Sequence, residues 1–239
     1  MTVSTSREPA RIAGMFDAIA RRYDTLNHLL SLGLDRRWRR RAIRELGLTG
    51  SERVFDVCTG TGDLAFEALG SSAGSAADVV GIDFAGQMLA RARVKAAKAG
   101  LSGRAHFVRG DAMQLPLPDR SSDAVTIAFG IRNVLEPAVA CREFFRVLRP
   151  GGHLAVLEFG MPRIPGIRAA YRWYFKYLLP RVGGLVSRHG EAYSYLPASV
   201  QQFATPEEFA AMLGSVGFDQ VRSVRLTLGI VYLHVAVRP

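Results

Sequence analysis

The segment from Arg53 to Asp63 (RVFDVCTGTGD) constrains this chain more than any other stretch. A short apolar strand ends near Asp56, and two glycines one residue apart, Gly60 and Gly62, precede a helical pattern that starts at Leu64. Glycine lets the backbone turn tightly and lets a ligand lie against it, and a helix start offers unpaired N–H groups. The segment therefore predicts a ligand cradle made of a strand, a glycine turn and a helix N-terminus.

Apolar segments that resemble strands alternate with helical patterns from this point onward. The strand candidates are Arg53–Cys58, Asp78–Asp83, Ala105–Arg109, Ala124–Phe129 and His153–Phe159. The helical candidates are Leu64–Leu69, Gln87–Ala99 and Pro137–Leu148, and the Arg149–Gly152 segment (RPGG) is predicted to be a turn. This alternation is typical of an α/β fold with a parallel sheet and helices on both faces.

The N-terminal 50 residues precede the first strand. Apolar residues recur at steps of three and four between Pro9 and Leu30, which predicts an amphipathic helix or a helix pair. A strongly basic helix is expected to start at Asp35, with Asp35 as its cap. We therefore expect a helical cap over residues 1–50 and a core over residues 51–239, together effectively one domain.

The C-terminal part begins with an aromatic-rich segment, residues 161–200, which is interpreted as an insertion. Thr205 and Glu208 form a capping-box pattern at the start of a closing helix. Two further strands, Gln220–Leu226 and Ile230–Val237, are joined so tightly that the last strand should be antiparallel. The expected sheet is therefore seven-stranded and mixed.

The chain of 239 residues has 31 Lys and Arg against 21 Asp and Glu, a formal net charge of +10. This charge favours an anionic partner, either nucleic acid or a membrane surface, and a solvated basic face remains the alternative. Cys58, Cys141 and five scattered histidines give neither a disulfide framework nor metal-ligand spacing, so no metal is expected. Because neither a signal peptide nor a membrane span is visible, we expect a cytoplasmic protein, with peripheral attachment at the inner face of the membrane left open.

The cradle is compatible with two cofactor classes. Gly60, Gly62 and Ala65 match the dinucleotide fingerprint, and Asp83 lies about where an acid would bind the ribose of NAD. However, Asp56 precedes the glycines and Asp111 follows the third strand, and an antiparallel last strand is foreign to the standard dinucleotide-binding sheet. Acids at three successive strand ends fit the ammonium, ribose diol and adenine of S-adenosylmethionine, which carries no phosphate. Unless Asp56 and Asp111 are merely capping or turn residues, the pattern predicts a methyltransferase core.

Longer segments carry a resemblance to a known family. They are DVCTGTGD, VVGIDFAGQMLARAR, FVRGDAMQLPLPDRSSDAVTIAFGIRNV, FFRVLRPGGHLAVLEF, MFDAIARRYDTLNHLLSLGLDRRWRR, EAYSYLPASVQQF and LTLGIVYLH. Together they resemble the class I S-adenosylmethionine-dependent quinone C-methyltransferases, which include the demethylmenaquinone and polyprenyl-benzoquinol methyltransferases. The resemblance implies a Rossmann-like class I methyltransferase fold.

The resemblance also implies which residues bind S-adenosylmethionine. The full set is Asp56, Gly60, Thr61, Gly62, Asp83, Phe84, Met88, Asp111, Ala112 and Ala128. Many members have Asn at the position of Asp111, and some have a cofactor-contacting Ser at the position of Ala128. The C-terminal sequence VYLHVAVRP also departs from the usual family ending.

The implied reaction is methylation of a ring carbon of a lipophilic quinol, most simply demethylmenaquinol to menaquinol, with a ubiquinone precursor or a secondary-metabolite acceptor as alternatives. Arg132 and Asn133 are candidates to stabilise a phenolate or orient a water, although Arg132 could instead form a salt bridge. Tyr195, with neighbouring Tyr193, could bond the acceptor or pack in the core. His234 and His189 are candidate bases, although a lone histidine is more often structural.

A prenylated quinol lies in the bilayer, so the basic segment Arg36–Arg44 around Trp38 is a candidate for contact with an anionic membrane. A homodimer is left open. An RNA methyltransferase is the competing class, but FGIRN stands where such enzymes carry a Pro-Pro-Tyr or Pro-Pro-Phe tetrapeptide, and no nucleic acid is expected. An NAD oxidoreductase is the third class.

Overall fold

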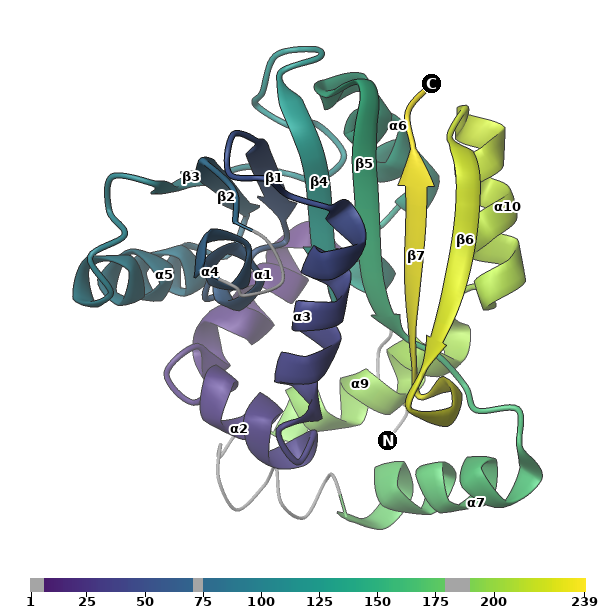
Figure 1. Cartoon of the computed structure of the whole chain (residues 1–239). Helices are drawn as coiled ribbons and strands as arrows, with labels where there is room; N and C mark the ends of the chain where they lie inside the picture. The colour runs from purple at the N-terminus through teal and green to yellow at the C-terminus, as the bar shows by residue number, and fades with distance from the viewer. Residues whose placement is uncertain (1–6, 71–74, 179–189) are drawn as a thin grey trace.

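The computed structural model describes residues 7–70, 75–178 and 190–239. Its strands form one sheet in the order β3-β2-β1-β4-β5-β7-β6 (Figure 1). Their bounds are β1 Arg53–Val57, β2 Asp78–Asp83, β3 Ala105–Arg109, β4 Ser122–Ala128, β5 Leu148–Phe159, β6 Asp219–Leu226 and β7 Val231–Val237. β1 to β5 pair in parallel, whereas β7 runs antiparallel to both β5 and β6. The predicted seven-stranded mixed sheet with an antiparallel last strand is confirmed.

Helices cover both faces of the sheet. They are α3 Leu34–Leu46, α4 Asp63–Gly70, α5 Gly86–Lys98, α6 Pro137–Val147 and α10 Pro206–Val216. On one face, buried residues of α3, α4 and α5 such as Ile43, Leu64 and Leu89 form a core cluster with the sheet. On the other face, Phe144 of α6 and Phe209 of α10 belong to a second cluster. The predicted capping box at the start of α10 is confirmed, because Thr205 and Glu208 bond reciprocally.

Several predicted boundaries shift for local reasons. β1 ends at Val57 and β4 ends at Ala128, because the next residues, Cys58 and Phe129, adopt left-handed φ angles of 52° and 58°. β5 begins at Leu148, so the turn predicted over Arg149–Gly152 is wrong as a separate element. That segment appears instead as a register shift in the pairing of β4 with β5.

The cap expected at Asp35 is also wrong. Gly33, with φ 75°, occupies the cap position of α3, and Asp35 lies inside the first turn. Its carboxylate is 2% exposed and accepts hydrogen bonds from Ser31 Oγ at 2.8 Å and from Arg39 Nη1 at 2.6 Å. Asp35 is therefore part of a buried ion-pair network and does not cap the helix.

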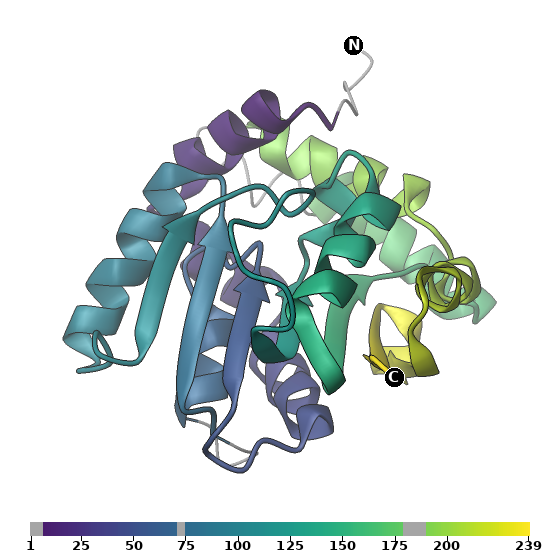
Figure 2. The same cartoon turned by 90° about the horizontal axis from the view of Figure 1, so that it is seen from above.

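The remaining helices lie at the edge where the parallel strands have their carboxyl ends (Figure 1). They are α1 Pro9–Ile19, α2 Tyr23–Leu30, α7 Pro165–Trp173, the π-helical η2 Tyr174–Leu178 and α9 Gly190–Gln202. Seen from above, α1 and α9 lie side by side, and α1 also contacts α5 (Figure 2). The predicted N-terminal helix pair is confirmed as α1 and α2, whereas the division of domains at residue 50 stays a prediction. Among the described residues, no helix is long and apolar enough to cross a membrane.

Charged side chains connect these N-terminal helices to the core. Arg39 of α3 contacts Asp35 at 2.6 Å and Asp63, the first residue of α4, at 3.2 Å. Lys95 of α5 contacts Asp63 at 2.5 Å and Asp24 of α2 at 2.9 Å. Burial alone would raise the pKa of Asp63, but Arg39 and Lys95 bring that pKa below its usual value. Four helices therefore share one network of alternating charge.

Arg39 pairs with two carboxylates of this network, so its replacement tests how much the network contributes to the free energy of unfolding. Arg39→Met leaves the buried Asp35 carboxylate without its cation, and such breakage typically costs about 3–5 kcal/mol of unfolding free energy. Arg41→Met on the same helix is the matched control, because its ion pair with Glu45 is 43% exposed on the Arg side and should contribute less than about 1 kcal/mol. Urea unfolding measures both, and equal losses for the two variants would contradict the network.

Candidate active site

The glycine turn is tied to the end of β2 by one carboxylate. Asp83 Oδ2 accepts the backbone N–H of Gly60 at 2.8 Å, and Asp83 Oδ1 accepts that of Ala85 at 2.9 Å. Asp83 is 8% exposed. Burial raises its pKa, and the backbone hydrogen bonds partly offset this rise. The predicted cradle is therefore held in place by Asp83, which also faces the cavity beside it.

Two positions of the turn adopt backbone conformations that favour glycine. Gly60 and Gly62 have φ angles of 57° and 86°, in the left-handed region that side chains rarely adopt. A Cβ at Gly62 would also lie 2.8 Å from the ring of Phe66. Larger residues at these positions would strain the turn and move the N–H groups that face the site.

Asp56 lies at the base of the turn. Its two carboxylate oxygens accept hydrogen bonds from the hydroxyls of Thr59 at 2.5 Å and Thr126 at 2.7 Å. It is 1% exposed, and burial raises its pKa to about 6 although both hydroxyls lower it. A buried carboxylate such as that of Asp56 is stabilised by a nearby cationic group, because the positive charge offsets the cost of burying the negative charge.

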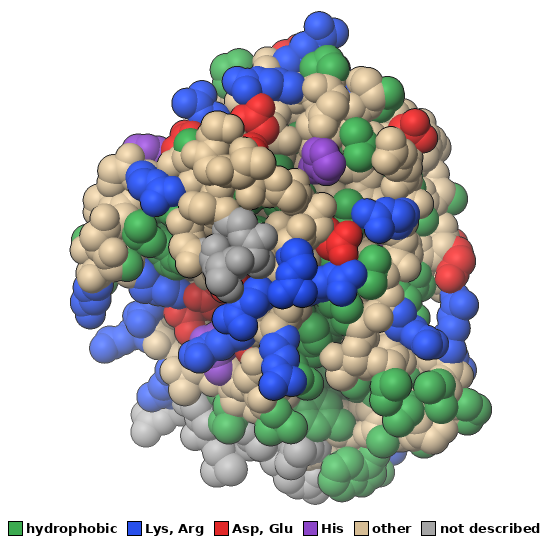
Figure 3. Space-filling model, viewed as in Figure 1, with side chains coloured by type: hydrophobic (Ala, Val, Ile, Leu, Met, Phe, Trp, Pro, Cys, Tyr) green, Lys and Arg blue, Asp and Glu red, His purple; other side chains and the backbone are tan. Residues whose placement is uncertain are grey.

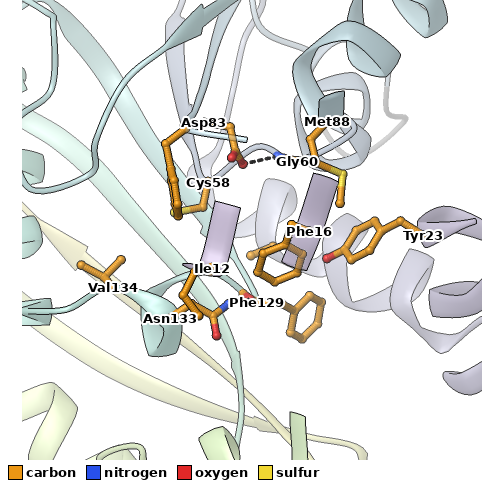
Figure 4. A pocket seen from close by; sticks show the side chains of 13 residues that line it. Ile12, Phe16, Tyr23, Cys58, Gly60, Asp83, Met88, Phe129, Asn133 and Val134 are labelled. Atoms are coloured by element: carbon orange, nitrogen blue, oxygen red, sulfur yellow. Dashed lines mark hydrogen bonds between the residues drawn. The ribbon is translucent and has the colours of Figure 1, made fainter. Parts of the chain in front are cut away.

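A small cavity opens beside Asp83 and Gly60 and is covered by the N-terminal helices (Figure 4). Its volume is 40 Å³. Its lining comes from Ile12, Phe16, Tyr23, Cys58, Gly60, Asp83, Phe84, Met88, Ala128, Phe129, Gly130, Asn133 and Val134. Asp83, Gly60, Phe84, Met88, Ala128 and Asn133, all expected at the site, are thus brought together. The side chains of Phe16, Tyr23 and Asn133 converge on the same space from different elements (Figure 4).

A second cavity of 30 Å³ lies along the glycine turn and is lined by Asp56, Thr61 and Asp63, among others. Tyr23, Cys58, Gly60, Ala128 and Phe129 line both cavities. Thr61 donates a hydrogen bond to Asp24 of α2, so its hydroxyl is engaged by the N-terminal helices.

Arg132 follows β4 on the 3-10 turn η1 Ile131–Asn133, as expected for a residue near the cofactor, but its guanidinium is already bonded. Nη1 contacts Glu158 Oε1 at 2.6 Å and donates to the carbonyl of Phe129 at 2.6 Å, and Nε donates to Ser199 Oγ at 3.3 Å. Arg132 is 5% exposed, and it is absent from the described lining of both cavities. The structure therefore supports the salt-bridge alternative, in which Arg132 fixes the η1 loop.

Asn133 is the polar side chain of this loop that faces the cavity (Figure 4). Nδ2 donates to the carbonyl of Phe129 at 3.4 Å, whereas the buried Oδ1 has no partner within the described structure. Leaving a buried acceptor unpaired costs about 1–3 kcal/mol. Such an acceptor beside a cavity is suited to receive a hydrogen bond from a ligand hydroxyl.

The other candidate catalytic residues are less well placed. Tyr195 of α9 is 2% exposed and its hydroxyl has no partner, but the residue does not appear in the described lining of either cavity. His234 of β7 bonds Ser223 Oγ through Nδ1 at 2.8 Å, and its ring packs 4.9 Å from that of Phe209. Burial lowers the pKa of His234 to about 4. His234 is thus a structural histidine away from the cavity, while His189 and the side chain of Tyr193 lie outside the described residues.

Asp111 and Ala112 lie just beyond β3. Asp111 Oδ1 accepts the backbone N–H of Met113 at 2.9 Å, which supports the turn-residue alternative. Ala112 is buried in the core cluster that contains Phe144. Neither residue lines the cavities in the described structure, so their contact with an adenine stays a prediction.

Sequence reasoning missed the contribution of α1 to the cavity. Ile12 and Phe16 were assigned only to an amphipathic pattern, and Val134 was not singled out. The spacing of Ile12 and Phe16 marks a buried helix face but carries no information on which surface that face covers. Tyr23 of α2 also contributes, since its ring lies 4.0 Å from the position of a Cβ on Gly60.

A possible metal-binding group occurs nearby but is already neutralised. His28, Asp35 and Asp63 bring potential ligand atoms within 4.8 Å of one another. Arg39 bonds both carboxylates, and Lys95 bonds Asp63. The charge that a cation would supply is therefore provided by side chains of the protein.

The chain is similar to known proteins over nearly its whole length. Residues 2–238 match the model of the ubiE/COQ5 methyltransferase family. A Geobacter sp. (strain M21) protein named ubiquinone/menaquinone biosynthesis C-methyltransferase UbiE is 45% identical, and the alignment covers 98% of each chain. A Thermus thermophilus protein named demethylmenaquinone methyltransferase is 49% identical over 94% of this chain and 100% of its own.

Solved structures resemble the fold at lower sequence identity. Phosphoethanolamine N-methyltransferase 2 of Haemonchus contortus, in complex with S-adenosyl-L-methionine, has a TM-score of 0.60 at 15% identity, covering 82% of this chain and 51% of its own. The [4+2]-cyclase SpnF has a TM-score of 0.65 at 22% identity, covering 97% and 96% of the two chains. These likenesses establish the Rossmann-like methyltransferase fold. The match over residues 2–238 and the identity to the two named relatives show that this chain belongs to the ubiE/COQ5 methyltransferase family.

Proposed function

We propose that this protein transfers a methyl group from S-adenosylmethionine to a ring carbon of a prenylated quinol, with demethylmenaquinol as the acceptor. The names of the relatives supply the reaction class. The observation that carries the proposal is the juxtaposition, in one cavity, of the Asp83–Gly60 cradle with the unpaired Oδ1 of Asn133. The Asp83–Gly60 cradle suits a nucleoside, and Asn133 Oδ1 suits a phenolic hydroxyl.

The residues of the cradle fit S-adenosylmethionine. The Asp83 carboxylate has about four lone-pair sites and uses two for backbone N–H groups, so two remain for a ribose diol. Asp56, whose pKa burial raises to about 6, would be stabilised by the ammonium of the methionine part. Phe84 and Met88 offer apolar contacts for the base.

The two cavities are too small for this cofactor as they stand. Their volumes of 40 and 30 Å³ compare with about 300–1,000 Å³ for typical ligand sites. Phe16 and Tyr23 of the N-terminal helices occupy the space above the glycine turn. Binding therefore requires α1 and α2 to withdraw from the turn, which breaks the Thr61–Asp24 hydrogen bond.

When bound, S-adenosylmethionine supplies a sulfonium methyl group for in-line attack by the electron-rich ring carbon. Asn133 Oδ1, which can accept a hydrogen bond but cannot take up a proton, would hold the phenolic hydroxyl and so orient the ring carbon toward the methyl group; the transfer releases S-adenosylhomocysteine and one proton to solvent. Arg132 and Glu158 hold the η1 loop so that this oxygen faces the cavity. Positioning of the two reactants is worth about 7–11 kcal/mol in well-oriented systems, and burial under α1 and α2 excludes water from the reacting atoms.

Asp83→Ala is expected to weaken the binding of S-adenosylhomocysteine by at least about a hundredfold, because two hydrogen bonds to a charged group contribute about 1.5–3 kcal/mol each. Isothermal titration calorimetry measures the affinity. Asp78→Ala, at the opposite end of the same strand and in an exposed ion pair with Arg53, is the matched control and should bind normally. Unchanged affinity for Asp83→Ala would remove the ribose assignment.

Asn133→Ala removes the acceptor for the phenolic hydroxyl. We expect kcat for demethylmenaquinol to fall by about tenfold to a hundredfold, with the affinity for S-adenosylhomocysteine unchanged. Asn133→Asp keeps an acceptor oxygen and should retain more activity. Transfer of a labelled methyl group from S-adenosylmethionine measures the activity. The same assay is run with a benzoquinol, an unprenylated phenol and transfer RNA as further acceptors. Transfer to RNA in preference to every quinol would overturn the proposal.

Contact with a membrane surface forms a further part of the proposed function. Arg36, Arg37, Arg40, Arg41 and Arg44 are exposed on α3 and form a basic face (Figure 3). Trp38, expected as an interfacial aromatic, is instead 6% exposed and donates through Nε1 to Thr227 Oγ1 at 2.8 Å. Hydrophobic side chains gather along the lower edge of the same view (Figure 3). Trp173 of α7, 58% exposed, is the aromatic residue suited to an interface.

Reversal of two charges on the basic face tests this contact. Each basic residue near an anionic surface contributes about 1 kcal/mol, so Arg36→Glu with Arg37→Glu should reduce binding to anionic vesicles by at least about thirtyfold. Arg120→Glu with Arg142→Glu makes the same change in net charge elsewhere, Arg142 being on α6 on the opposite face of the sheet, and should have a smaller effect. Vesicle co-sedimentation that depends on neither anionic lipid nor salt would contradict membrane contact.

A further inference from the structure

A larger cavity lies outside the cradle and the basic face. Its volume is 380 Å³, within the range of about 300–1,000 Å³ usual for ligand sites. It lies between α2, α7, η2 and the 3-10 turn η3 Thr227–Gly229 that joins β6 to β7. Its described lining is mostly apolar and includes Leu32, Trp38, Phe159, Ala170, Tyr171 and Leu228. We refer to it as the apolar cavity.

Most hydroxyls of this lining are already engaged by the protein. Ser31 Oγ donates to Asp35, Thr227 Oγ1 accepts from Trp38, and the Tyr174 hydroxyl donates to the carbonyl of Leu30 at 3.0 Å. The buried hydroxyl of Tyr171 is the exception, since it has no partner among the described residues. Apart from Asn27 and the Tyr171 hydroxyl, the cavity therefore presents a hydrocarbon surface to a ligand.

Stacked aromatic rings form a wall between the apolar cavity and the cavity at the cradle. Phe129 lines the cradle cavity, whereas Phe159 and Trp38 line the apolar cavity. The ring centroid of Phe129 lies 4.5 Å from that of Phe159 and 6.1 Å from that of Trp38. Rotation of these three side chains would connect the two cavities, so that a ligand with its polar ring at the cradle could place an attached chain in the apolar cavity.

The apolar cavity also reaches the molecular surface. Leu32 and Leu228 line it and are 85% and 52% exposed. Both residues have left-handed φ angles, 51° and 57°, in the tight connections that precede α3 and β7. Leu32 lies four residues before Arg36, so the opening adjoins the basic face on α3.

We propose that the apolar cavity binds the isoprenoid tail of the acceptor while the quinol ring lies at Asn133. This proposal rests on the proposed function for the identity of the acceptor. The rings of Trp38, Phe129 and Phe159 would rotate apart to admit the tail, which would extend toward the opening at Leu32 and Leu228. Burial of branched hydrocarbon from water stabilises the complex in proportion to the area covered.

Binding can be tested without methyl transfer. The chain has two tryptophans, and Trp173→Phe leaves Trp38, which lines the cavity, as the sole tryptophan, so that excitation beyond the tyrosine absorption band reports on Trp38 alone. Titration of this variant with farnesol should give a saturable change in Trp38 emission. Adding Ala170→Phe, which fills the cavity from α7, should weaken farnesol binding by at least tenfold. Ala169→Phe, on the same helix but outside the described lining, should leave farnesol binding unchanged.

Kinetics provide the second measurement. The ratio of kcat/KM for a diprenylated acceptor to that for an unprenylated acceptor should exceed about ten, and Ala170→Phe should lower this ratio while Ala169→Phe does not. The proposal would be overturned if farnesol showed no saturable binding or if the two alanine substitutions had equal effects. Tighter binding of a straight-chain alcohol of equal length would also overturn it.

Isoprenoid binding in the apolar cavity and methylation of a quinol can be separated by experiment. Farnesol binding that depends on Ala170, in a protein that methylates no quinol, would uphold the cavity as an isoprenoid site and overturn the proposed function. Methylation of quinols with no dependence on tail length, together with no farnesol binding, would uphold the function and overturn the tail site.

Discussion

The Asp83 carboxylate is the interaction on which the rest of the site depends. It accepts N–H groups from two different segments, the glycine turn at Gly60 and the start of α5 at Ala85. The turn between β1 and α4 is thereby fixed against the end of β2, although the two are 23 residues apart in the chain. Because the same carboxylate faces the cavity, a ligand bound there acts on both loops at once.

The N-terminal helices complete the site and also close it. Asp17 of α1 accepts the backbone N–H of Gln87 at 2.8 Å, and Asp24 of α2 bonds Thr61 and Lys95. These contacts involve the same glycine turn and α5 start that Asp83 organises. The arrangement leaves cavities of only 40 and 30 Å³, so we expect α1 and α2 to move when the cofactor enters.

Local sequence patterns predicted the elements and the cradle because the responsible residues are neighbours in the chain. Gly60, Gly62 and the strand before them lie within one segment, and the capping box of Thr205 and Glu208 spans four residues. Strand ends were less predictable, because the left-handed backbone at Cys58 and Phe129 has no glycine to mark it. The ubiE/COQ5 resemblance, carried by several such segments, was confirmed by the family match.

Side-chain roles were predicted less well because they depend on distant partners. Arg132 is bound by Glu158 and Ser199, which lie 26 and 67 residues away, so its motif could not distinguish a reactive guanidinium from an ion pair.

The same limit applies to two other residues. Trp38 is buried through a hydrogen bond to Thr227, 189 residues away, and a basic sequence around a tryptophan carries no signal of that contact. His234 lies in a strand, and its contact with Ser223 depends on the pairing of β6 with β7.

The central claim is that the cavity beneath α1 and α2 binds S-adenosylmethionine through Asp83. A crystal structure of the complex with S-adenosylhomocysteine tests it most directly. We predict ribose hydroxyls within hydrogen-bond distance of the Asp83 carboxylate, with Tyr23 displaced from its position over Gly60. A nucleoside bound without contact to Asp83, or bound with Tyr23 and Phe16 unmoved, would contradict the account.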